Sequence, residues 1–141
     1  MSVSIPETHV DLLERSIHAV LSTMMPDGQP QSSMVWCDYD GEHVLISTTL
    51  ERQKGKNMAA NPKVTLLVID PEDGSRYLEV RGEVVEMSQE GAVELADRLT
   101  RFYTDKQHFY GDIYPAEQQF EETRVVCWIR PVKTTVDAIF K

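Results

Sequence analysis

The chain has 141 residues, of which 41% are hydrophobic and 26% are charged, as is ordinary for a globular protein. Its 14 Lys and Arg against 23 Asp and Glu give a net charge of −9, which argues against a nucleic-acid surface, because such binding depends on neutralising phosphates. The apolar runs are too short to span a membrane, and the N-terminus lacks the basic and apolar regions of a signal peptide. We therefore expect a cytoplasmic protein with one domain over residues 1–141.

The first half of the chain predicts a helix followed by three strands. Ser4 can cap the helix and Pro6 suits its first turn. Strands are predicted at residues 18–25, 31–39 and 42–49. Residues 26–29 and Asp40-Gly41 have the composition of tight turns, so these three strands are expected to be antiparallel.

The second half alternates helical and strand patterns. Residues 52–61 predict a short helix, 63–70 a strand, and 76–87 a long strand with a wetter and a drier face. A helix is predicted to open at residues 88–90, and residues 105–119 are aromatic and turn-rich without a period. One or two closing strands are predicted over 124–130 and 132–139. Many strands joined by tight turns around one small core predict a mainly β fold, a barrel with flanking helices.

A basic cluster stands out in this acidic chain. Arg52, Lys54 and Lys56 lie within five residues, and Ser47-Thr48-Thr49 precede them at the end of a predicted strand. In a helix Arg52 and Lys56 would share one face. Such a cluster is either a solvated connector or a seat for an anion, because Arg and Lys bind phosphate by charge-assisted hydrogen bonds.

Other motifs of catalysis are missing. Cys37 and Cys127 are far apart in apolar runs, which predicts buried free thiols, and no metal site is predicted because no ligand spacing of that kind occurs. No phosphate-binding glycine loop, nucleophile elbow or zinc-protease motif is present. The four histidines are scattered, and none is predicted to be catalytic: His9, His18, His43 and His108.

The run LISTTLERQKGKNMAANPKVTLLVID, followed by GSRYLEVRGEVVEM, resembles the flavin-binding split β-barrel superfamily that includes the pyridoxamine-phosphate oxidases. DGQPQSSMVWCDYDGEHVLIST is similar to its opening hairpin and RVVCWIRPVKTT to its closing strand. The resemblance covers nearly the whole chain. It is strongest to the branch of deazaflavin-dependent oxidoreductases that use coenzyme F420.

This resemblance implies a six-stranded antiparallel split barrel that forms a two-fold homodimer with cofactors at the subunit interface. It also implies site residues. Gln31, Ser32, Ser33, Met34 and Val35 would line the tricyclic ring, and Ser47, Thr48 and Thr49 would approach the cofactor side chain. Arg52, Lys54, Lys56 and Asn57 would hold the phosphate, while Ser75, Arg76 and Tyr77 would reach the cofactor from the partner chain.

The function implied is that of an F420-dependent reductase, which transfers a hydride to an electron-poor small organic substrate. F420 is favoured over FMN because three cations suit its more anionic tail. The alternatives are an FMN-dependent oxidoreductase and a flavin- or F420-binding carrier or sensor without turnover. Residues 106–119 have no match in the family and are expected to shape the substrate side. A proton donor, if the reaction uses one, is expected at Tyr77 or within residues 108–114.

Overall fold

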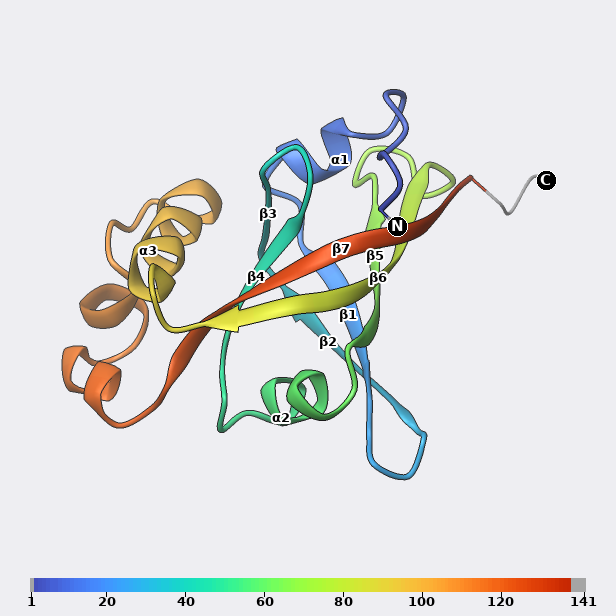
Figure 1. Ribbon diagram of the computed structural model, residues 1–141. Helices are drawn as coiled ribbons and strands as arrows, with labels where there is room; N and C mark the ends of the chain where they lie inside the picture. The colour runs from blue at the N-terminus through green and yellow to red at the C-terminus, as the bar shows by residue number, and fades with distance from the viewer. Residues whose placement is uncertain (1, 138–141) are drawn as a thin grey trace.

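The computed structural model describes residues 2–137. Within them, seven strands form one curled antiparallel sheet in the order β2-β1-β5-β6-β7-β4-β3 (Figure 1). The strands are β1 (Ala19–Met24), β2 (Pro30–Val35), β3 (Cys37–Tyr39), β4 (Val44–Thr49), β5 (Lys63–Ile69), β6 (Tyr77–Ser88) and β7 (Arg124–Val136).

The sheet curls around a core built from alternate residues of its strands. In β1, Ala19 and Leu21 are buried while Val20 between them is exposed, as the two-residue period of a strand requires. The long strands β6 and β7 bend together at a register shift after Arg81. A Cβ atom at Gly82 would lie 2.6 Å from the Cγ2 atom of Ile129, so glycine permits this close approach of β6 to β7.

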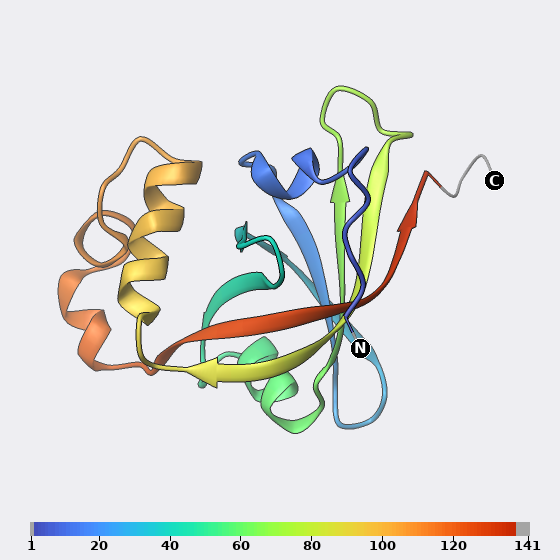
Figure 2. The same ribbon diagram turned by 45° about the horizontal axis from the view of Figure 1, so that its top comes forward.

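The helices lie on different sides of the sheet. Figures 1 and 2 show α1 (Asp11–Glu14) and α2 (Gln53–Ala60) at opposite ends of the barrel and α3 (Ala92–Tyr103) to one side. Between α3 and β7 the chain forms an irregular turn, η1 (Phe109–Ile113), in which Tyr110 and Gly111 are not helical, and a 3₁₀ turn, η2 (Ala116–Phe120). The lobe of α3, η1 and η2 connects the end of β6 to the start of β7. Because the start of β7 pairs with the end of β4, the lobe lies near the basic cluster that follows β4.

The mainly β antiparallel split barrel predicted from the sequence is confirmed, with seven strands in place of six. The strand predicted over residues 31–39 is divided at Trp36, because β2 pairs with β1 and β3 pairs with β4. The closing strand is continuous to Val136. Residues 138–139 of the predicted closing strand lie outside the described residues.

Two helix starts were predicted too early. The first helix begins at Asp11 rather than near Ser4, since residues 7–10 form turns in which the His9 N–H donates to the Pro6 carbonyl at 2.9 Å. The third begins at Ala92 rather than at residue 88, because β6 stays paired with β7 as far as Ser88. In the part of the chain that the structure describes, no helix is long and apolar enough to cross a membrane.

The two cysteines are buried in the core as free thiols, as the sequence predicted. Burial raises the pKa of the Cys37 thiol to about 11 and that of Cys127 to about 12. Both side chains therefore act as small apolar core residues and not as nucleophiles.

Candidate cofactor-binding site

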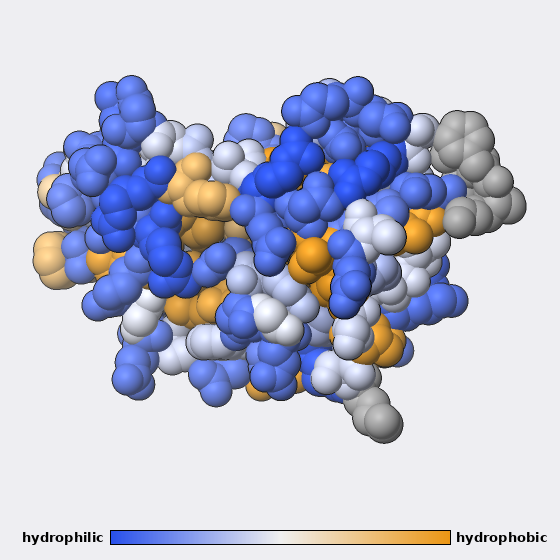
Figure 3. Space-filling model, turned by 90° about the horizontal axis from the view of Figure 1, so that it is seen from above, coloured by the Kyte–Doolittle hydropathy of each residue, from blue (hydrophilic) through white to orange (hydrophobic). Residues whose placement is uncertain are grey.

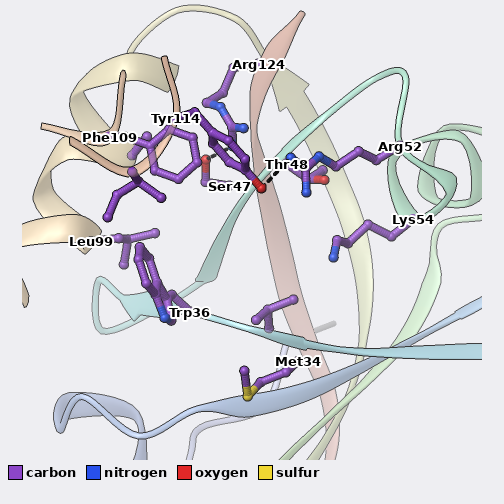
Figure 4. Close-up of a pocket in the computed structure, with 13 residues that line it drawn as sticks. Met34, Trp36, Ser47, Thr48, Arg52, Lys54, Leu99, Phe109, Tyr114 and Arg124 are labelled. Carbon is purple, nitrogen blue, oxygen red and sulfur yellow. Dashed lines mark hydrogen bonds between the residues drawn. The ribbon is translucent and has the colours of Figure 1, made fainter. Parts of the chain in front are cut away.

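A pocket of about 230 Å³ opens where the lobe of α3 and η1 meets the barrel. Figure 3 shows hydrophobic surface exposed on the α3 side of the molecule, among hydrophilic patches. In Figure 4, Arg52 and Lys54 lie on one side of the pocket and Trp36, Leu99 and Phe109 on the other. The lining residues are Met34, Val35, Trp36, Ser47, Thr48, Arg52, Lys54, Ala96, Leu99, Phe109, Ile113, Tyr114 and Arg124.

The basic side of the pocket is set by how α2 packs on β4. Helix α2 follows Arg52 directly, and the backbone turns sharply between Thr49 and Arg52. A Cβ atom at Gly55 would lie 1.9 Å from the Thr49 carbonyl oxygen, so only glycine lets the helix lie this close to the strand end. This packing carries Arg52 and Lys54 to the pocket wall.

The basic wall carries the positive charges of Arg52 and Lys54. The Lys54 Nζ donates to Ser33 Oγ at 3.0 Å, and the Arg52 Nη2 donates to the Tyr114 phenol oxygen at 3.0 Å. Neither cation forms an ion pair with a carboxylate of residues 2–137. Burial, followed by the charges of Arg52 and Arg124, lowers the pKa of Lys54. An anion bound here would relieve both the repulsion and the desolvation.

Two hydroxyl groups beside the cations lack partners. Thr48 and Thr49 are almost fully buried, and their Oγ1 atoms find no hydrogen-bond partner among the described residues. An unsatisfied buried polar atom costs roughly 1–3 kcal/mol. Thr48 lines the pocket, so a ligand with hydroxyl or phosphate oxygens would supply what the fold leaves open there. The residues present thus fit a phosphorylated cofactor.

The opposite wall is apolar and rigid. Trp36 stacks on Tyr103, with ring centroids 5.3 Å apart and an interplanar angle of 13°. The Tyr103 hydroxyl in turn accepts from the Cys37 N–H at 3.2 Å and donates to the Ile17 carbonyl at 3.1 Å. A fixed aromatic face of this kind suits a planar ring system.

Arg124 organises the corner between these walls. Its guanidinium donates to Tyr110 at 2.8 Å, to Ser47 at 2.9 Å and to Glu122 at 3.2 Å, and it lies 4.3 Å from the Phe109 ring centroid. Because Glu122 compensates its charge, Arg124 adds less net positive charge than Arg52 or Lys54. It holds Ser47 and the lobe in place.

The structure brings part of the predicted site together. Met34, Val35, Ser47, Thr48, Arg52 and Lys54 all line the pocket, and Ser33 contacts Lys54. Gln31 and Thr49 do not line it, and the Ser32 hydroxyl instead pairs with Ser22 at 2.7 Å.

Two of the residues predicted to hold the phosphate, Lys56 and Asn57, do not line the pocket. Lys56 is exposed on α2. The Asn57 amide is buried and donates to Thr23 Oγ1 at 3.0 Å, so it fastens α2 to β1. Their predicted contact with the phosphate stays a prediction.

Ser75, Arg76 and Tyr77 lie at the β5–β6 turn, at the end of the barrel away from α2 (Figure 1). Arg76 is engaged there by Asp70 at 2.9 Å and Asp11 at 2.5 Å. These residues were predicted to reach the cofactor of a partner chain, which one chain does not test.

Sequence reasoning missed four residues of the pocket lining: Trp36, Ala96, Leu99 and Arg124. Residues 106–119 were expected to shape the substrate side, and they supply Phe109, Ile113 and Tyr114. The sequence pattern predicted Ala96 and Leu99 only as core residues of a helix, and Trp36 only as a strand residue. Arg124 stood at the head of an apolar strand, where a buried cation signals a partner; its charge partner is Glu122, and its contact with the pocket residue Ser47 spans 77 positions.

Comparison with known proteins agrees with this geometry. Residues 5–135 match the family described as pyridoxamine 5'-phosphate oxidase. The chain therefore belongs to the pyridoxamine 5'-phosphate oxidase family. This confirms the flavin-binding split-barrel oxidoreductase class that the sequence resemblance implied.

Several solved structures are similar to this member of the pyridoxamine 5'-phosphate oxidase family. An F420 reductase is 34% identical, over 93% of this chain and 98% of that one, with a TM-score of 0.80. The conserved hypothetical protein Rv2991 of Mycobacterium tuberculosis is 23% identical over 96% and 86%, with a TM-score of 0.72. A Listeria innocua protein described as a putative pyridoxamine 5'-phosphate oxidase is 21% identical over 92% and 95%, with a TM-score of 0.68. The last two show the fold alone. No curated protein matches the chain significantly.

Proposed function

We propose that this protein is an F420-dependent reductase, which transfers a hydride between the deazaflavin coenzyme and an electron-poor small organic substrate. The observation that carries the proposal is the cation pair Arg52 and Lys54, which forms no ion pair with a carboxylate of residues 2–137 and faces an aromatic wall in one pocket. The 34% identity to an F420 reductase over nearly the full length of both chains supports the choice of cofactor.

Different residues of the pocket would bind the phosphate and the ring of the cofactor. Arg52 and Lys54 would hold the phosphate, and Thr48 would supply a hydrogen bond beside it. Met34 and Val35 on β2, with Trp36, would contact the ring and exclude water from it. When bound, the coenzyme supplies the hydride, so the protein needs no catalytic triad. Binding both reactants in one fixed orientation is the protein's main contribution.

FMN is the second candidate for the cofactor. The matched family is named for pyridoxamine 5'-phosphate oxidases, and a phosphate seat accepts the phosphate of FMN as well. F420 is more anionic because of its tail, and it gains more from a dense cation cluster on a chain with a net charge of −9. A carrier or sensor would use the same pocket without turnover, and only an assay with acceptors separates it from a reductase.

The proposal is tested by removing one cation of the seat. Arg52→Ala is expected to weaken F420 binding by about 1–3 kcal/mol, the contribution of a charge-assisted hydrogen bond, measured by titration of cofactor fluorescence. The matched control is Lys133→Ala, which removes an exposed cation of β7 outside the pocket. Equal affinities for the wild-type protein and Arg52→Ala would overturn the assignment of the seat.

A further inference from the structure

Tyr114 connects the two walls of the pocket. It comes from the lobe, directly after η1, and Figure 4 shows it extending toward Arg52. Its phenol oxygen accepts a hydrogen bond from Arg52 Nη2 at 3.0 Å, and the guanidinium carbon lies 5.4 Å from its ring centroid. Residues 52 and 114 are 62 positions apart, so no local sequence pattern predicts their contact.

The hydroxyl of Tyr114 has a proton left to donate. A phenol is one donor and one acceptor, and the acceptor is used by Arg52. Within residues 2–137, the structure gives the hydroxyl proton no acceptor. The proton is therefore available to a ligand acceptor beside Arg52, in the pocket that Tyr114 lines.

The position of Tyr114 is fixed before any ligand binds. Its N–H donates to the Phe109 carbonyl at 3.0 Å, and its carbonyl accepts from the Gly111 N–H at 2.6 Å. Gly111 has φ of 113°, a conformation that side chains of L-residues rarely adopt, so glycine closes this loop. The Asp97 carboxylate accepts from the Phe109 N–H at 2.8 Å and ties the loop to α3. A donor held in this way loses little entropy when it binds.

We propose that Tyr114 is an uncharged member of the anion seat, which donates its phenolic hydrogen bond to an oxygen of a bound phosphate monoester while it accepts from Arg52. This inference rests on the proposed function, because it takes the cation pair as the phosphate site. It assigns a phosphate-binding role to the lobe, whose residues 106–119 were expected to shape the substrate side and, within 108–114, to offer a proton donor. Phosphate binding and the substrate side are thereby coupled through one residue.

A neutral donor and a cation leave different signatures in solution. Loss of a cation weakens phosphate binding and also reduces its dependence on salt, because that dependence comes from charge. Loss of a phenol hydroxyl weakens binding with the salt dependence unchanged. The hydrogen bond from a neutral group to a charged one corresponds to about a tenfold change in affinity or somewhat more.

The experiment compares the wild-type protein with Tyr114→Phe, Arg52→Ala and Tyr39→Phe, by F420 fluorescence titration at several salt concentrations. Tyr39 lies on β3 outside the pocket and is the matched control for loss of a phenol hydroxyl. We expect Tyr114→Phe to lose about tenfold in affinity with an unchanged slope of log Kd against log salt. Arg52→Ala is expected to lose affinity with a shallower slope, and Tyr39→Phe to lose neither.

The outcomes separate this inference from the proposed function. If Arg52→Ala weakens binding while Tyr114→Phe equals the wild-type protein, the role of Tyr114 is overturned and the phosphate seat stands. If the wild-type protein does not bind F420, the proposed function fails, and the same variants are compared by thermal stabilisation with FMN and with inorganic phosphate. Stabilisation that depends on both Arg52 and Tyr114 would then support the inference, and stabilisation independent of Tyr114, or none, would overturn it.

Discussion

Lys54 is the residue at which the electrostatics of the pocket are most directly measurable. Its pKa is lowered by burial and by Arg52 and Arg124, so its ammonium group loses its proton at a lower pH than the roughly 10.4 of an ordinary lysine. A bound anion favours the charged form. Affinity for a phosphorylated cofactor is therefore expected to fall as the pH rises through the pKa of Lys54 in the free protein.

This pH dependence has a matched control in Lys54→Arg. Arginine keeps its charge across the accessible alkaline range, so the variant is expected to lose the alkaline decline that the wild-type protein shows. The measurement is the Kd of F420 between pH 7 and pH 10.5, with folding checked at each pH. Parallel curves for the two proteins would show that Lys54 does not contact the anion.

At the scale of the element, α2 depends on one glycine. Gly55→Ala places a methyl group 1.9 Å from the Thr49 carbonyl oxygen, which is much closer than van der Waals contact. Overpacking costs about 1–3 kcal/mol, whereas replacing a helical glycine by alanine gains about 1 kcal/mol. The packing cost should prevail, so Gly55→Ala is expected to be less stable and to bind cofactor more weakly, because Arg52 and Lys54 move with the helix.

The control for this variant is Gly74→Ala, in the β5–β6 turn, where a Cβ atom meets nothing within 4 Å. Both proteins are compared by urea unfolding and by cofactor titration. A Gly55→Ala protein as stable as Gly74→Ala would mean that α2 can shift away from β4 without cost.

The elements show what the sequence can and cannot predict. An apolar run located β5, and two-residue alternation located β6, each to within a residue or two, because the burial of a strand leaves a local pattern. The division at Trp36 was not predictable, since it results from a change of pairing partner and not from a local breaker. The late start of α3 has the same origin, because strand pairing with β7 extends β6 through residues that could have begun a helix.

The site follows the same rule. Arg52 and Lys54 were found because they are adjacent in a chain of opposite net charge. The contact of Tyr114 with Arg52 and that of Arg124 with Ser47 were not predicted, because they span 62 and 77 positions. Contacts between residues so far apart in the sequence depend on how the whole chain folds, so no local sequence pattern predicts them.

At the scale of the whole molecule, we propose that the chain forms a homodimer. The outer face of β1, β5, β6 and β7 is hollowed by a groove of about 590 Å³ and exposes Val20 and Val132. Light scattering is expected to give twice the chain mass of 16.1 kDa. Val20→Glu should shift the protein toward the monomer, because it places a charge on an apolar contact face. A wild-type monomer at micromolar concentration would contradict the proposal.

We propose that the pocket of Arg52, Lys54 and the aromatic wall binds F420. Absorption and fluorescence titration of the protein with F420 and with FMN, side by side under the same conditions, decides this. We expect saturable binding of F420, tighter than that of FMN, which is lost or strongly weakened in Arg52→Ala. Tighter binding of FMN, or F420 binding that Arg52→Ala leaves intact, would contradict the account.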